Sequence, residues 1–230
     1  MAIGCNLFAD RGRCATQEGV GWAEMTKERL KSPRARLFVA LDLPDEVREG
    51  LVAWQHEALT DQALRPIPPE ALHVTLCFLA YQPERDIERI SAVMRWVDPR
   101  RVQVRFKEEP AAVPPNRPRL FAADAESEAA IELQAELSDR LEAERFYRPE
   151  KRPFWPHVTV ARIKPSKRSA SDRRGRRRGR PMHVETPPKA LPAELCEPFS
   201  AVRVTLYRSN LRPTGAEYVS LACLGLPPPG

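Results

Sequence analysis

Two short stretches of one pattern, LHVTL at residues 72–76 and PHVTV at residues 156–160, decide the interpretation of this chain. In a β-strand, residues two apart point to the same face of the sheet. The valine and the flanking apolar residues of each stretch would therefore face a core. The histidine and the threonine would project together from the opposite face. Each stretch is thus predicted to be a strand that presents one imidazole beside one hydroxyl.

Two such strands brought face to face would carry the groups that phosphodiester cleavage requires. One imidazole can act as a base towards the attacking water and the other as an acid towards the leaving oxygen, because the ordinary histidine pKa lies near neutrality. His73 and His157 are the candidates for these roles. The hydroxyls of Thr75 and Thr159 can donate hydrogen bonds to the oxygens that gain charge in the transition state. The pattern indicates chemistry that needs no metal.

These residues also have other interpretations. A single His-x-Thr in a strand is commonly structural, but two of the four histidines share the same context, which favours function. His56 and His183 are expected to be solvated bystanders. A zinc site would need a third ligand, and Cys77 is the one candidate, since its strand parity matches that of His73. No carboxylate joins it, so the sequence predicts no metal. Gly-rich phosphate-binding patterns are absent from the sequence, and no other cofactor is predicted.

The surrounding periodicity mixes strands and helices without a strict βαβ repeat, which favours an α+β fold with mostly antiparallel sheets. Apolar stripes at helical spacing predict three helices, one that Pro44 opens and one with Ile131 turned inward. The predicted strands cover residues 37–41, 72–78, 102–106, 120–123, 157–163, 201–207 and 218–223, and the helices residues 44–58, 87–97 and 126–144.

Charge is unevenly distributed along the chain. The net charge is +6, but residues 164–180 carry nine basic side chains against Asp172, which is 9 − 1 = +8 and leaves 6 − 8 = −2 for the rest. We expect residues 1–33 to be a disordered extension, residues 34–225 to form one domain, and residues 226–230 to be a tail. Residues 165–198 are predicted to be a basic, disordered insertion that either attracts RNA electrostatically or is merely solvated.

The cysteine content and hydropathy point to the cytoplasm. Five cysteines without paired spacing argue against a disulfide framework. No apolar run reaches the roughly 20 residues that span a bilayer, so no membrane contact is predicted. No coiled-coil pattern is present, and we expect a monomer.

Four sequence blocks together resemble the two-histidine phosphoesterases, and within them the RNA 2′,3′-cyclic phosphodiesterases, also called 2′-5′ RNA ligases. The blocks are RLFVALDLP at residues 36–44, PPEALHVTLCFL at 68–79, RPFWPHVTVAR at 152–162, and VTLYRS at 204–209, followed by Gly215 and Tyr218. The resemblance implies a bilobal α+β fold. Two mostly antiparallel sheets, related by a pseudo-two-fold, would line a central cleft with the helices outside.

The resemblance also implies an activity and separate roles. The substrates would be RNA ends with a 2′,3′-cyclic phosphate, or cyclic nucleotides, and the product a 2′-phosphomonoester. By position, His73 matches the proton donor, His157 the proton acceptor, and Thr75 and Thr159 the phosphate-binding hydroxyls.

Arg162 matches a recurrent arginine that would contact phosphate. Its strand parity places it on the Val158 face, so it reaches the cleft only if the strand bends or ends. Phe78 has core parity, and Phe154 and Trp155 are expected in the core rather than stacked on a base. Two alternatives remain, namely RNA ligation by the reverse chemistry and non-catalytic RNA binding through the arginine-rich loop.

Overall fold

The computed structural model of the chain describes residues 33–166, 180–212 and 215–228. The described residues from Arg34 onward gather into one compact unit. The predicted extension lies outside the described residues, except for Pro33. The described part has three α-helices, α2 (Asp45–Ala58), α3 (Ile87–Arg95) and α4 (Glu128–Ala143), and the 3₁₀ turns η1 (Pro69–Ala71), η2 (Glu84–Asp86) and η4 (Ala193–Cys196). None of these helices is long and apolar enough to cross a membrane.

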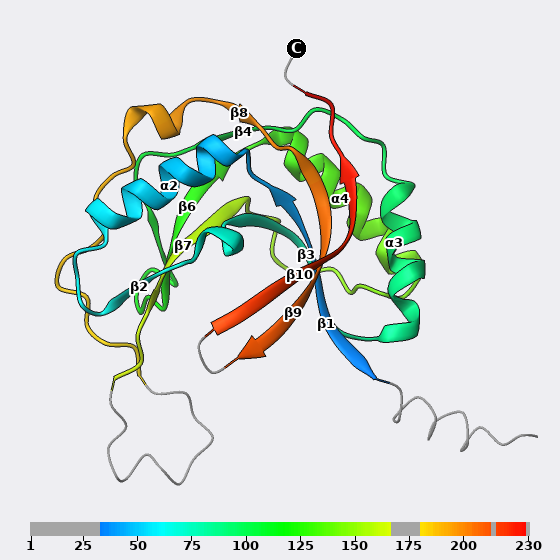
Figure 1. Cartoon of the computed structure of the whole chain (residues 1–230), viewed down its shortest axis with the longest axis horizontal. Helices are drawn as coiled ribbons and strands as arrows, with labels where there is room; N and C mark the ends of the chain where they lie inside the picture. Colours follow the sequence, from blue (N-terminus) through cyan, green and yellow to red (C-terminus); the bar gives the residue numbers. More distant parts are fainter. Residues whose placement is uncertain (1–32, 167–179, 213–214, 229–230) are drawn as a thin grey trace, which may run out of the picture. The chain divides into compact units, whose positions relative to one another are not determined.

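The described strands form one antiparallel sheet (Figure 1). Its main path runs in the order β10 (Gly215–Gly225), β9 (Arg203–Arg212), β1 (Arg34–Asp42), β3 (His73–Pro83), β7 (His157–Ile163), β6 (Leu120–Glu126), β4 (Gln103–Phe106) and β8 (Phe199–Ser200). Two short strands pair off this path, β2 (Leu64–Pro66) with β7 and β5 (Ala111–Val113) with β6.

The fold is therefore α+β with antiparallel pairing, as predicted, but the prediction of two separate sheets needs a correction. The described strands follow a single hydrogen-bonded path. Its two halves are joined only where β3 meets β7, through the one residue pair Val74 and Val158. The sequence marks each motif strand but contains nothing that shows whether the two strands pair with one another.

Helix α4 shows how the core is built. It begins after Ser127, whose hydroxyl accepts a hydrogen bond from the Ala130 amide at 3.0 Å, as an N-cap does. Its buried stripe is Ala130, Leu133, Leu137 and Leu141, the spacing of one helical face. The prediction that Ile131 points inward is wrong, because this residue lies next to the stripe rather than in it and is 46% exposed.

Each motif strand is covered by one helix (Figure 1). The buried side chain of Gln55 on α2 donates to the Val160 carbonyl of β7 at 2.7 Å. On the other half, Gln134 of α4 lies 3.9 Å from the Cys77 sulfur of β3. The two helices thus leave the opposite face of the motif strands free.

The predicted disordered insertion is ordered in its second part. Residues 167–179 lie outside the described residues, but residues 180–198 pack on the domain. Leu191 and Leu195 are buried there, and the Ala190 carbonyl accepts a hydrogen bond from the Trp54 indole at 3.0 Å. The prediction averaged the composition over the whole stretch. It therefore missed two leucines that have a core to enter once the arginine-rich part has ended.

Candidate active site

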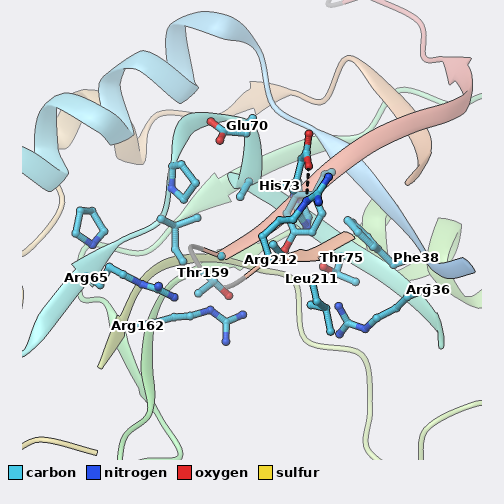
Figure 2. Close-up of a pocket in the computed structure, with 18 of the residues that line it drawn as sticks. Arg36, Phe38, Arg65, Glu70, His73, Thr75, Thr159, Arg162, Leu211 and Arg212 are labelled. Atoms are coloured by element: carbon cyan, nitrogen blue, oxygen red, sulfur yellow. Dashed lines mark hydrogen bonds and ion pairs between the residues drawn. The ribbon is translucent and has the colours of Figure 1, made fainter. Parts of the chain in front are cut away.

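The two His-x-Thr stretches meet in one cavity of about 1010 Å³ (Figure 2). Strands β3 and β7 pair through Val74 and Val158, the residue between histidine and threonine in each motif. Because the pairing is antiparallel, position 73 lies beside position 159, and position 75 beside position 157. The two histidines are diagonal neighbours, which places their backbones about 7–8 Å apart. Both imidazoles and both threonine hydroxyls line the same cavity.

A β-bulge brings Arg162 into the same cavity. In the pairing of β7 with β6, Ala161 opposes Phe121 and Thr159 opposes Ala122, so Val160 is an extra residue. The extra residue reverses the inside–outside alternation beyond it. Val160 and Ala161 are consequently both buried, and Arg162 projects into the cavity on the side of Thr159.

Strand β3 has a bulge at the equivalent position, and it corrects two predictions. Cys77 opposes Val39 and Thr75 opposes Ala40, so Leu76 is the extra residue. Phe78 therefore leaves the core, lines the cavity and is 40% exposed. Cys77 turns into the core and is 1% exposed, which removes it as a third zinc ligand beside His73. Within the described ranges, no three His, Cys, Asp or Glu side chains are grouped as a metal site.

Trp155 holds the His157 ring in one orientation. Its Nδ1 lies 2.8 Å from the Trp155 carbonyl oxygen. A carbonyl can only accept, so Nδ1 carries the proton and the neutral ring keeps its lone pair on Nε2. The Trp155 indole stacks on the imidazole with centroids 4.2 Å apart and donates to Asp124 Oδ1 at 2.6 Å. Trp155 is thus a support for His157, and the prediction that it is a core residue missed this role.

His73 sits in an aromatic pocket. Phe38 stacks on its imidazole at a centroid distance of 5.0 Å, and Tyr218 approaches edge-on at 5.4 Å. Burial lowers the pKa of His73 from 6.5 to about 4. The Asp42 carboxylate acts in the opposite direction, and the neighbouring His157 adds a smaller lowering. The protonation of His73 therefore depends on how much negative charge stands near it.

Asp42 is buried beside His73 with its oxygens occupied. It is the cross-strand neighbour of His73 and accepts hydrogen bonds from Arg203 at 2.6 Å, Thr205 at 2.9 Å and Tyr207 at 2.8 Å. Burial, followed by this carboxylate, raises the pKa of Tyr207 to about 12, so its phenol remains a donor. These bonds keep a carboxylate in place that would otherwise be costly to bury.

The two histidines have equivalent carboxylate neighbours. Asp124 is the cross-strand partner of His157, as Asp42 is of His73. Sequence reasoning missed both aspartates. A signal for them exists, because each follows a similar apolar sequence, LFVALD at residues 37–42 and LFAAD at 120–124.

Four arginines line the cavity and give it a positive rim (Figure 2). Two have partners, since Arg36 donates to the Ser209 hydroxyl at 2.8 Å and Arg212 pairs with Glu217 at 3.2 Å. The other two, Arg65 and Arg162, are register partners on β2 and β7. The cavity also contains Glu70 and Glu217, so its four arginines outnumber its carboxylates and its lining suits an anionic ligand. Sequence reasoning assigned no role to Arg65, for which the sequence offers only its charge as a signal.

The other two histidines and Arg208 are not among the residues that line this cavity. His56 is exposed on α2, and His183 is exposed in the described segment that begins at residue 180. Arg208 pairs with Glu84.

A pair of strands that brings one histidine and one threonine each into a single cavity is the arrangement of a two-histidine phosphoesterase. The chain belongs to the 2′-5′ RNA ligase superfamily, whose family model matches residues 43–174, more than half of the sequence.

Relatives in other organisms support this placement. The chain is 34% identical over 136 residues to the RNA 2′,3′-cyclic phosphodiesterase of Thermus thermophilus, covering 56% of this chain and 69% of that protein. It is 25% identical over 185 residues to the protein of the same name from Methanocaldococcus jannaschii, covering 80% and 96%.

Solved structures share the fold. The crystal structure of TT0787 from Thermus thermophilus matches with a TM-score of 0.66 and 28% identity, covering 83% of this chain and 97% of that chain. LigT of E. coli, complexed with 3′-AMP, matches with a TM-score of 0.62 at 21% identity, covering 84% and 99%. The LigT match shows the fold alone.

Proposed function

We propose that the protein hydrolyses 2′,3′-cyclic phosphodiesters at RNA ends or on nucleotides, giving 2′-phosphomonoesters, by paired acid and base catalysis without a metal. One observation carries the proposal, namely that the two His-x-Thr strands pair directly and place both imidazoles and both hydroxyls in one cavity. The relatives named as RNA 2′,3′-cyclic phosphodiesterases agree with it.

The reaction follows from the side chains at hand. Nε2 of His157 takes a proton from water as the water oxygen attacks phosphorus. The bond between phosphorus and O3′ breaks, and His73 donates a proton to O3′. The hydroxyls of Thr75 and Thr159 bind the non-bridging oxygens as charge develops there. The product is a 2′-phosphate beside a free 3′-hydroxyl, and water supplies the oxygen that phosphorus gains.

The surroundings of the two rings support this division of roles. The Trp155 carbonyl fixes the proton of His157 on Nδ1, which leaves Nε2 as a base. Burial lowers the pKa of His73 to about 4 and the Asp42 carboxylate opposes that lowering, so the charged ring that an acid needs depends on further negative charge, which a bound phosphate would bring. The acceptor role of His157 thus has a physical reason in addition to the resemblance, and the donor role of His73 rests on the resemblance and on the charge of the bound phosphate.

We further infer that the two halves of the domain are related by a pseudo-two-fold. Both motif strands bulge one residue after the threonine, and both have an aspartate opposite the histidine. The two halves differ in the contacts of the histidine ring. A backbone carbonyl contacts His157, and an aromatic pocket surrounds His73.

The test is product analysis with adenosine 2′,3′-cyclic phosphate and with an RNA ending in a cyclic phosphate. We expect adenosine 2′-monophosphate from the nucleotide, and kcat lower by about 10²–10⁴-fold in His73→Ala and in His157→Ala. The matched control is His56→Ala, which removes an exposed histidine outside the cavity. Adenosine 3′-monophosphate as the product, or full activity in either cavity variant, would contradict the mechanism. A ligated product when a 5′-hydroxyl strand is added would favour the reverse reaction.

A further inference from the structure

Two arginines face each other across neighbouring strands at one side of the cavity. Arg65 of β2 and Arg162 of β7 are register partners in an antiparallel pair. Side chains in such positions start about 5 Å apart, and like charges directly opposite destabilise a sheet. Both side chains are exposed and line the cavity beside Thr159 (Figure 2). Two guanidinium groups that repel one another are well placed to bind an anion between them.

Neighbouring carboxylates do not neutralise this pair within the described ranges. Among the described residues, Arg212 forms an ion pair with Glu217, whereas Arg65 and Arg162 form no ion pair. Arg36, at the far side of the cavity, is engaged with Ser209 and lies over the Phe78 ring. The positive charge available to a ligand is therefore concentrated on the side formed by β2 and β7.

The backbone under the two arginines is held rigidly. The Ile67 amide donates to the Val160 carbonyl at 3.1 Å, which ties the end of β2 to the bulge of β7. The buried Gln55 donates to the same carbonyl at 2.7 Å and to the Ile67 carbonyl at 3.0 Å. The bulge that turns Arg162 into the cavity is thus fixed by a side chain from α2. The backbone of the fold therefore fixes the positions from which the two arginine side chains project.

The pair is too far along the strand to hold the reacting phosphate alone. Thr159 and Arg162 are three residues apart on β7, about 10 Å at ~3.3 Å per residue and somewhat less across the bulge. We propose that Arg65 and Arg162 bind a second phosphate, the one on the 5′ side of the terminal nucleotide, while the cyclic phosphate lies between the histidines. Resting on the proposed function, this identifies the substrate class as RNA 3′ ends or 5′-phosphorylated nucleotides rather than simple nucleoside cyclic phosphates.

The experiment compares kcat/KM on adenosine 2′,3′-cyclic phosphate with kcat/KM on the same compound carrying a 5′-phosphate. We expect the wild-type protein to prefer the 5′-phosphorylated substrate at least tenfold. Arg65→Gln should lose at least tenfold more on that substrate than on the unphosphorylated one, and Arg65→Lys should lose less. The control is Arg101→Gln, an exposed arginine outside the cavity, which should keep the preference. Equal kcat/KM on both substrates, or an equal loss on both in Arg65→Gln, would overturn the inference.

A binding measurement separates this inference from the proposed function. Calorimetry with adenosine 2′,5′-bisphosphate and adenosine 2′-monophosphate needs no turnover. We expect the bisphosphate to bind at least tenfold more tightly, with a difference that shrinks as salt rises and that Arg65→Gln removes. Failure to hydrolyse either cyclic substrate would refute the proposed function, and the bisphosphate would still decide the role of the arginine pair. Equal affinities would refute that role even if hydrolysis proceeds.

Discussion

The low pKa of His73 predicts that this ring becomes protonated near neutral pH only when a phosphate ligand is bound. A general acid must be protonated, yet burial lowers the pKa of this imidazole to about 4 in the protein alone. A phosphate in the cavity adds a negative charge within reach of the ring, as Asp42 does from the other side. We therefore expect binding of adenosine 2′-monophosphate to raise the pKa of His73 into the neutral range.

The size of the rise follows from the spacing of the site. A unit charge about 4 Å from the ring, at an effective dielectric constant of about 20, contributes ~4 kcal/mol. At ~1.4 kcal/mol per pKa unit this is about 3 units. The pKa of His73 should then move from about 4 to roughly 7. At pH 6 the protonated fraction of the ring would rise from ~0.01 to ~0.9.

Nuclear magnetic resonance of the imidazoles measures this directly, because the chain has only four histidines. A titration from about pH 5 to about pH 8 brackets the ordinary histidine pKa. Without ligand, the His73 ring should stay neutral throughout, and with ligand it should titrate near the middle of the range. The spectrum of His73→Gln assigns the signal. A ring that remains neutral at pH 6 with ligand bound would refute the reasoning and leave the donor role without a proton.

Three further perturbations test other parts of the molecule. Because the folded pKa of His73 is below the unfolded value, the unfolded chain binds the extra proton between pH 6.5 and about 4. Stability should therefore fall as pH drops through that window, by up to about 3 kcal/mol, and urea unfolding of His73→Gln should show a smaller fall. Gln55→Leu removes donors from the Val160 and Ile67 carbonyls and should cost ~1–3 kcal/mol, or about 2–4 °C in Tm per kcal/mol, in a thermal melt. Gln134→Leu, which loses only a 3.9 Å contact with sulfur, should change Tm much less, and equal shifts would contradict the stabilising role of the Gln55 hydrogen bonds. EDTA should leave turnover of the cyclic substrate unchanged, and an activity that returns only on adding a divalent ion would contradict acid–base catalysis by the two histidines.

The sequence predicts the strands and helices well because their apolar residues recur at regular intervals. The three predicted helices correspond to α2, α3 and α4, and both motif strands begin at the histidine. The faces of His73 and Thr75, like those of His157 and Thr159, follow directly from the two-residue period. These side chains precede the point where either strand becomes irregular.

Beyond that point the period fails for a physical reason. A bulge adds one residue, so every later side chain changes face. Phe78 and Cys77 were assigned to the wrong faces for this reason, and Arg162 reaches the cavity because of it. Neither bulge contains a glycine that would announce it. The bulge of β7 is stabilised by Gln55, a residue about a hundred positions away, and such a contact has no local signature.

The pairing of β1 with β9 has a consequence for how the protein is made. Asp42, next to His73, accepts hydrogen bonds from three residues of β9, and one of them, Tyr207, lies 165 positions later in the chain. At synthesis rates of about 5–20 residues per second, roughly 10–30 s separate the emergence of these two residues from the ribosome. During that interval the carboxylate has none of the donors that β9 provides. The pocket around His73 is therefore completed only near the end of translation, and a prematurely terminated chain would display the motif without its support.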